Sequence, residues 1–206
     1  MPDESPLIDA LRRGDEAAFA ALVERYHGAL LRLAMSFVPS RAVAEEVVQE
    51  TWLGVLEGLA RFERRSSLKT WIYRILINRA RTRGERERRY VTASPVESED
   101  DAAIDPARFA PDGHWALPPD RWDEGTPEKL LLNSEARKQL DQAIEALPPQ
   151  QRQVITLRDV EGLSAEEICN ILEISETNQR VLLHRARAKV RRALEQYLHS
   201  ESRRVP

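Results

Sequence analysis

The sequence predicts an all-α protein made of two small helical domains joined by an extended acidic linker. Apolar residues recur every three or four positions through residues 7–89 and again through 128–198, which is the period of an amphipathic helix. Between these stretches the period disappears. A composition of 32% charged residues with only 8 Gly also favours exposed helices over sheet. We therefore expect domains at residues 1–93 and 128–206, with the linker at 94–127.

The first domain contains three apolar stripes, which predict three or four helices. Pro39-Ser40 separates the first from the second, and the polar run 63–66 separates the second from the third. The stripes consist of Phe19, Leu22, Val23, Tyr26, Leu30 and Leu33, then Val43, Val47, Val48, Thr51, Trp52, Val55, Leu56 and Leu59, then Leu68, Trp71, Ile72, Ile75 and Leu76.

The linker is defined by its composition. Residues 94–127 include six prolines, and nine acidic residues outnumber Arg108 and Arg121. Such a segment lacks the apolar residues that a packed core needs. Trp115 and Trp122 are unusual in a passive spacer, so we expect part of the linker to dock on another surface.

Charge is segregated along the chain. The net charge of −3 argues by itself against a nucleic-acid binder. However, residues 61–92 hold 11 basic and 3 acidic side chains, and residues 176–206 hold 8 and 3. Local clusters set the field that a phosphate backbone meets, so both segments are candidates for nucleic-acid binding.

Several other classes of protein are disfavoured. The single Cys169 cannot form an internal disulfide, and the four His show no recurrent zinc-ligand spacing. There is no glycine-rich phosphate loop and no nucleophile with a recognisable base. No apolar run is long enough to span a membrane, and the N-terminus is acidic. We expect a cytoplasmic protein that is not an enzyme, with no cofactor, no metal and no membrane insertion.

A helix-turn-helix is predicted near the C-terminus. Ser164 and Glu167 have the spacing of a capping box, and Leu163 and Ile168 can close a hydrophobic staple around it. After a short turn, Ser175 can cap a longer, strongly basic helix. Two capped helices joined by a tight turn are typical of this DNA-binding motif.

The second helix of such a motif enters the major groove. The candidates for reading bases share one helical face, and the basic residues further along are candidates for holding the phosphate backbone. The base-reading candidates are Arg180, Val181, His184 and Arg185, and the backbone candidates are Arg187 and Lys189. The alternative is a solvated basic helix at the end of a bundle.

Motifs in both halves of the chain resemble the sigma-70 family, in particular its extracytoplasmic-function (ECF) group. The matching segments are 14–19, 44–52, 61–62 and 67–79 in the first half, and 147–155, 157–168 and 183–187 in the second. The resemblance implies a region 2 that binds core RNA polymerase and melts the −10 promoter element, and a region 4 that binds the −35 element.

The chain departs from the family pattern at the start of the recognition helix. The family usually has Gly-Thr-Val there, followed by a basic residue, whereas this chain has Thr177-Asn178-Gln179. Gln179 takes a position that is normally apolar and buried, and Leu182 one that is normally basic. These departures leave the fold assignment intact but weaken the transfer of individual base contacts from the family.

The resemblance assigns the remaining partners and sites. It implies that Glu46, Gln49, Glu50 and Trp52 contact the β′ clamp of core polymerase, and that the β flap is a second contact. The alternative for this helix is a core element with a solvated acidic side. The −10 candidates are Phe62, Ser67, Lys69, Trp71, Arg74, Asn78, Arg79 and Arg81. Trp71 can belong either to the core or to the strand-binding surface.

Control of activity has two possible forms. The resemblance implies an anti-sigma factor that covers both basic surfaces, and the composition allows self-inhibition by the acidic linker. A different function class also stays open, namely a helix-turn-helix regulator that binds its operator without core polymerase.

Overall fold

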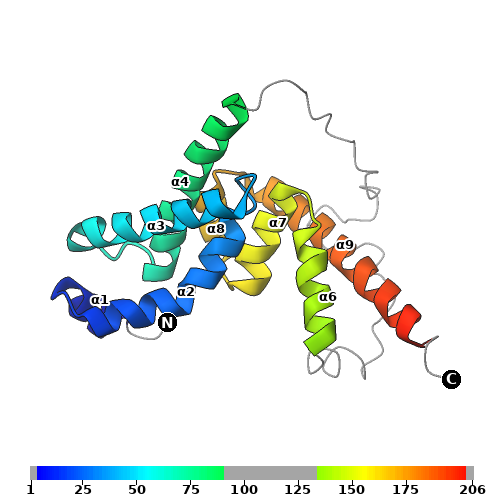
Figure 1. Cartoon of the computed structure of the whole chain (residues 1–206), viewed down its shortest axis with the longest axis horizontal. Coiled ribbons are helices and arrows are strands. Elements are labelled where there is room, and N and C mark those ends of the chain that lie inside the picture. Colours follow the sequence, from blue (N-terminus) through cyan, green and yellow to red (C-terminus); the bar gives the residue numbers. More distant parts are fainter. Residues whose placement is uncertain (1–3, 91–133, 203–206) are drawn as a thin grey trace. The chain divides into compact units, whose positions relative to one another are not determined.

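The computed structural model describes residues 4–90 and 134–202, with side chains at 4–87 and 137–197. These residues form helices and connecting segments without a strand, which confirms the all-α prediction. The α-helices, labelled in Figure 1, are α1 (Ser5–Arg12), α2 (Glu16–Ala34), α3 (Arg41–Gly58), α4 (Leu68–Tyr90), α6 (Ser134–Glu145), α7 (Pro149–Ile155), α8 (Ala165–Leu172) and α9 (Glu176–Ser202). Two short helical segments, η1 (Leu59–Arg61) and η3 (Thr156–Val160), follow α3 and α7.

The chain divides into two compact units by contact. The first combines Met1–Ser94 with Leu157–Ile174, and the second combines Pro95–Thr156 with Ser175–Pro206. The first unit therefore holds α1 to α4 and also α8, while α9 belongs to the second. The domain limits of 1–93 and 128–206 remain a prediction. The linker, with Trp115 and Trp122, lies outside the described residues.

The first unit is built on α2, α3 and α4, which contact one another pairwise. Each contributes an apolar stripe to one core. Leu30 and Leu33 of α2, Val47 and Val48 of α3, and the middle of α4 are at most 1% exposed. In α4 the fully buried residues are Ile72, Tyr73, Leu76, Ile77 and Ala80. The three predicted stripes therefore meet in a single interior.

Local capping groups begin the helices of this unit. Asp15 accepts a hydrogen bond from the Ala18 N–H at the start of α2, and Ser40 accepts one from Val43 at the start of α3. The Ser67 hydroxyl accepts one from the Thr70 N–H at 3.1 Å in the first turn of α4. Each cap satisfies a backbone donor that the helix itself leaves without a partner.

The second unit packs α6 and α7 against α9. Its core consists of Leu147, Ile155, Ala186 and Val190. Partly buried Leu140, Ile144, Leu183 and Leu194 lie around that core. Pro149 occupies the first position of α7, where a residue without an N–H leaves no helical hydrogen bond unmade.

The predicted helix ends near the C-terminus are confirmed. Ser164 and Glu167 form a capping box at the start of α8, and Ser175 accepts a hydrogen bond from the Asn178 N–H at the start of α9. Glu173 ends α8 with φ 55° and ψ 43°. This left-handed conformation costs a residue with a Cβ roughly 1–2 kcal/mol.

One apolar stripe is less regular than predicted. Leu56 was assigned to the buried face of α3, but its side chain is 51% exposed, and Leu53 is 58% exposed. The reason is geometric: α3 already buries Val48, Trp52 and Val55, and Leu56 lies beyond the edge of that face.

Gly84 should be essential to the packing of α4, although alanine is the better helix former by about 1 kcal/mol. A Cβ at Gly84 would lie 2.4 Å from the backbone oxygen of Phe37. We expect Gly84→Ala to lower the free energy of unfolding by about 1–3 kcal/mol, as overpacking does.

Gly28→Ala is the matched control. A Cβ there would lie 3.6 Å from Arg32 Nη1, a flexible group, so this variant should gain about 0.5–1 kcal/mol. Urea unfolding followed by circular dichroism measures both. Equal stabilisation by the two substitutions would contradict the close approach at Gly84.

Candidate nucleic-acid interface

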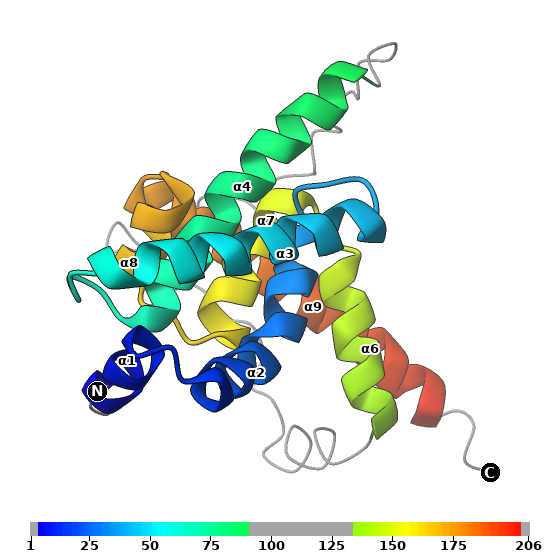
Figure 2. The ribbon, with the colours of Figure 1, turned by 60° about the vertical axis from the view of Figure 1, so that its left-hand side comes forward.

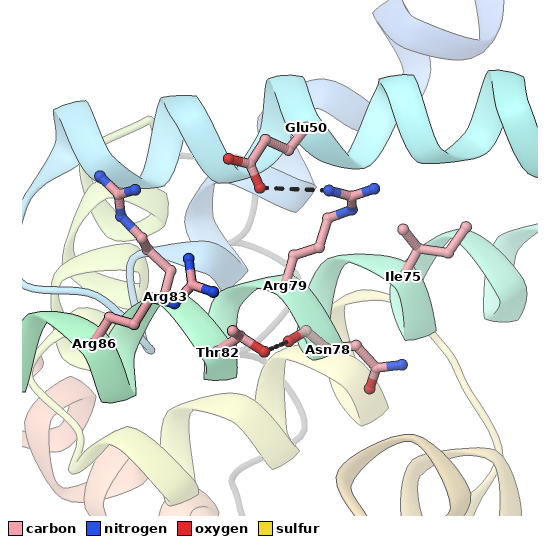
Figure 3. A pocket seen from close by; sticks show the side chains of 7 residues that line it. All are labelled: Glu50, Ile75, Asn78, Arg79, Thr82, Arg83 and Arg86. Carbon is pink, nitrogen blue, oxygen red and sulfur yellow. Dashed lines mark hydrogen bonds and ion pairs between the residues drawn. The ribbon is translucent and has the colours of Figure 1, made fainter.

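A basic pocket of about 490 Å³ lies between α3 and α4 (Figure 3). Its α4 members recur every three or four residues and therefore share one face of the helix. The lining residues are Glu50, Ile75, Asn78, Arg79, Thr82, Arg83 and Arg86. Three arginines against one glutamate give the pocket a positive field, which suits a phosphate group.

Carboxylates of α3 orient two of these arginines. Arg79 Nη1 lies 3.4 Å from Glu50 Oε2, drawn as a dashed line in Figure 3, and Arg83 Nη2 lies 2.8 Å from Glu46 Oε2. Both pairs are partly exposed, so each contributes at most about 1 kcal/mol to stability. The main effect of the two ion pairs is on orientation, because they hold both guanidinium groups toward α3.

The side chain of Asn78 points in a different direction from that of Arg79. Figure 3 shows its amide pointing away from α3, and the residue is exposed. Thr82 Oγ1 donates to the backbone carbonyl of Asn78 at 3.0 Å and does not involve the amide. Arg74 is also exposed. An amide that can both donate and accept hydrogen bonds is suited to a base edge.

Two further members of the predicted −10 set contact residues 157–174. Lys69 Nζ lies 3.1 Å from Glu161 Oε2 and also donates to the Glu161 backbone carbonyl. Arg81 Nη1 lies 2.9 Å from Glu173 Oε2, and its other amino group donates to the Leu172 carbonyl. The predicted set is therefore spread over several faces of α4.

The aromatic and hydroxyl candidates beside α4 have structural contacts. Phe62 is only 5% exposed, and its ring centroid lies 4.8 Å from that of the half-buried Trp71. Ser67 caps α4 and shares a 2.7 Å hydrogen bond with the Thr70 hydroxyl. This packing favours the core alternative for Trp71. The assignment of all three candidates to the −10 surface remains a prediction.

The sequence did not reveal how the loop before α4 is supported. Arg12 of α1 donates to the backbone carbonyls of Leu59 and Phe62, at 3.3 and 2.6 Å. Arg64 adopts φ 58° and pairs with Asp9 of α1. These partners lie about 50 positions apart in the chain, so no local pattern could mark them.

The outer face of α3 combines polar and apolar side chains. Glu46, Gln49 and Glu50 are exposed, as the polymerase prediction requires. Leu53 and Leu56 lie one and two helical turns beyond Gln49 on the same side of α3. Both leucines are exposed, which the sequence did not predict. Trp52 is only 8% exposed and meets the Phe19 ring edge-on at 5.8 Å. In this structure Trp52 supports the helix from inside.

Helix α9 has one buried face and one exposed face. Gln179, Leu182, Ala186 and Val190 are buried, so the unusual glutamine occupies the buried position of the family pattern. Among the base-reading candidates Arg180 and Val181 are exposed, and His184 and Arg185 are half-buried. Of the backbone candidates, Arg187 is exposed and Lys189 half-buried.

The charge state of His184 bears on what it can bind. Partial burial lowers the pKa of its imidazole, and the charges of Arg185 and Arg187 lower it further. The ring is therefore neutral at pH 7 and carries one donor and one acceptor. A neutral ring is better suited to a base edge than to a phosphate.

Within 4–90 and 134–202, no group of three or more His, Cys, Asp or Glu side chains could hold a metal ion. No helix of these two stretches is long and apolar enough to cross a membrane.

Comparisons with known proteins match both halves of the chain. The family model described as "Sigma-70 region 2" matches residues 22–90, and the one described as "Sigma-70, region 4" matches residues 137–190. The chain is 33% identical over 195 residues to the RNA polymerase sigma-H factor of Pseudomonas aeruginosa, covering 95% of each protein. It is 34% identical over 184 residues to the ECF RNA polymerase sigma-E factor of Escherichia coli, covering 89% of this chain and 90% of that protein.

Solved structures show the same fold at lower identity. CnrH in complex with the cytosolic domain of CnrY aligns with a TM-score of 0.53 at 22% identity, covering 92% of this chain and 96% of that one. The sigma factor RpoE from Bartonella quintana, crystallised with the anti-sigma factor NepR, aligns with a TM-score of 0.56 at 22% identity, covering 86% and 96%.

Glu50→Gln should strengthen binding of single-stranded DNA, because Arg79 then loses a competing carboxylate. We expect a gain of about 1.5- to 5-fold at low salt, which corresponds to the free energy of an exposed ion pair. Fluorescence anisotropy with a labelled oligonucleotide measures it. Glu57→Gln removes an exposed charge two turns further along α3 and serves as the control. Equal gains in both variants would show that Arg79 is not limited by Glu50.

Proposed function

This chain belongs to the ECF group of the sigma-70 family, and we propose that it binds core RNA polymerase and directs promoter-specific initiation of transcription. The observation that carries the proposal is the presence of regions 2 and 4 in one chain, in that order. Region 2 overlaps the basic segment 61–92, and region 4 overlaps the basic segment 176–206. A factor of this kind selects promoters, and the polymerase performs the chemistry.

The outer face of α3 is the proposed docking surface for the β′ clamp. Leu53 and Leu56 expose more than half of their side chains beside Glu46, Gln49 and Glu50. Exposed leucines ringed by polar groups suit a protein partner, since burying each one contributes about 1–2 kcal/mol. We propose that Trp52 acts indirectly, by fixing α3 against Phe19. Region 4 is the proposed contact for the β flap.

Promoter DNA is assigned to two helices. On α4, Asn78 and Arg74 are exposed for a melted −10 strand, and the basic pocket beside them can take its phosphates. On α9, Arg180, Val181, His184 and Arg185 are assigned to −35 bases. Val181 is 42% exposed, and an outward apolar side chain suits a thymine methyl group.

Two further parts of the proposal concern setting and control. A factor that works with core polymerase on chromosomal DNA acts in the bacterial cytoplasm. We also propose control by an anti-sigma factor. The supporting observation is that two proteins of the same fold were solved in complexes, CnrH with the cytosolic domain of CnrY and RpoE with the anti-sigma factor NepR.

Order of addition tests the function as a whole. The protein alone should bind promoter fragments weakly, and core polymerase should confer specific footprints and run-off transcripts from genomic fragments. Footprinting with and without core enzyme measures this. A specific footprint by the protein alone, unchanged by polymerase, would instead indicate a helix-turn-helix regulator.

Two substitutions on α9 separate base reading from phosphate binding. Arg185→Ala should cost about 1–3 kcal/mol at one position of the −35 element and relax the preference there. Lys189→Ala should weaken all sequences alike and reduce the salt dependence of binding. Competition binding of the polymerase complex to −35 variants, repeated over a salt series, measures both. Sequence-neutral losses in both variants would remove Arg185 from base reading.

A further inference from the structure

Helix α1 lies beside the segment that joins α3 to α4, as Figure 2 shows. It contacts η1, the last helical turn before the loop 62–67, and it also packs on α2. Ile8 and Leu11 form the buried side of α1, at 2% and 6% exposure. The apolar face therefore fixes α1 to the core, and its polar side chains are left to contact the loop.

Side chains at the two ends of α1 bind the helix ends that flank this loop. Arg12 donates to the backbone carbonyls of Leu59 and Phe62, at the C-terminal end of η1. Glu4 Oε2 accepts a hydrogen bond of 2.9 Å from the Leu68 N–H, at the first position of α4. A cation at a helix C-terminus and an anion at a helix N-terminus both have the sign that the helix dipole favours. Helix α1 and the residue before it thus cap both sides of the loop.

A third contact holds the middle of the loop. Arg64 has φ 58°, in the left-handed region that a residue with a Cβ rarely adopts. Its guanidinium donates to the Ser5 hydroxyl at 3.0 Å and pairs with the Asp9 carboxylate. Ser5 and Asp9 are four positions apart and therefore lie on the same side of α1. The strained residue of the loop is consequently held from α1.

The exposed part of the loop lies between these anchors. Phe62 and Leu68 are buried, at 5% and 2% exposure, whereas residues 63–66 between them are exposed. These four residues are a glutamate, two arginines and a serine, which offer donors and acceptors to bases and phosphates. A loop that DNA had to order would bind more weakly, and a loop that is fixed beforehand avoids that entropic cost.

We propose that α1 is a brace that holds the loop 62–67 in one conformation for contact with the −10 strand. Arg12 and Asp9 are the positioning residues of this brace, and they act through the loop without touching DNA. The inference rests on the proposed function, in which region 2 binds the melted −10 element. It gives a role to α1, which precedes the residues 22–90 that match region 2.

Hydrogen exchange of the full-length protein tests the hold of α1 on the loop. Arg12→Met keeps an aliphatic side chain and removes the donors. Arg13→Met removes the same charge from the neighbouring exposed position and is the matched control. Exchange in residues 59–68 should be faster in Arg12→Met and unchanged in Arg13→Met. Equal exchange in the two variants, or equal acceleration throughout residues 4–90, would overturn the brace.

Binding of the −10 strand measures the consequence for DNA. The probe is a fluorescein-labelled single strand from a promoter found by run-off transcription, added to the complex with core polymerase. Arg12→Met should bind it about 3- to 10-fold more weakly than Arg13→Met, because the loop spends less time in the competent conformation. The preference for the native strand over single-base variants should also fall, which a mere loss of folded protein would not cause. Equal affinity and equal preference in the two variants would refute the proposal.

Salt dependence separates positioning from direct contact. Loss of one phosphate contact lowers the slope of log affinity against log salt by about 0.7 for a single strand. The slopes of Arg12→Met and wild type should be equal, since Arg12 binds backbone carbonyls of the protein. A lower slope in Arg12→Met, with no such change in Arg13→Met, would show that Arg12 binds the strand itself and is not a positioning residue.

A charge exchange tests the contact in the middle of the loop. D9R places two arginines side by side and should accelerate hydrogen exchange in residues 62–67. D9R/R64D restores a pair of opposite charges and should slow that exchange again toward the wild-type rate. Unchanged exchange in D9R, or a double variant that exchanges as fast as D9R, would contradict the role of Asp9.

Run-off transcription distinguishes failure of this inference from failure of the proposed function. If wild type yields no transcript with core polymerase and Arg12→Met still accelerates exchange in residues 59–68 alone, the proposed function fails and the hold of α1 on the loop stands. If wild type transcribes and Arg12→Met equals Arg13→Met in exchange and in −10 preference, the proposed function stands and the brace fails.

Discussion

The first compact unit depends on one constraint, namely that α4 must bury one face while it carries a dense positive charge on the others. Ile72, Tyr73, Leu76 and Ile77 are fully buried, so the arginines and Lys69 can only point sideways or outward. Neighbouring elements supply carboxylates to these charges, Glu46 and Glu50 from α3 and others from residues 157–174. The apolar stripe fixes the position of α4, and the carboxylates decide the direction of each basic side chain.

Ion pairs of this kind orient side chains and are easily exchanged. Most of them are partly exposed, so each contributes little to stability. A phosphate group offers the same charge and similar acceptor geometry, and it can replace a glutamate at small cost. The pair between Lys69 and Glu161 is better shielded. Contacts of this kind leave the basic side chains of α4 able to exchange a carboxylate for a phosphate.

The outer face of α3 differs from that of α4 because it exposes apolar side chains. Val47, Val48 and Val55 fill the inner side of α3 and are at most 1% exposed. Leu53 and Leu56 consequently remain outside, in contact with water. Trp52 packs on Phe19 and holds the helix in place. A rigid helix with leucines on its outer side can bind a partner without reordering its backbone, which lowers the entropic cost of association.

The sequence by itself determined the features that depend on residues within four positions of one another. The capping box of Ser164 and Glu167, the cap at Ser175 and the helical stripes were predictable for that reason. The basic segments and the family were also readable from composition and motif order. Only the tertiary structure decided which face of α4 each basic residue occupies. Arg79 meets Glu50 across 29 positions, and Arg81 meets Glu173 across 92. Such pairs depend on how helices pack, and helix packing is set by side-chain shape across the whole core rather than by any local pattern.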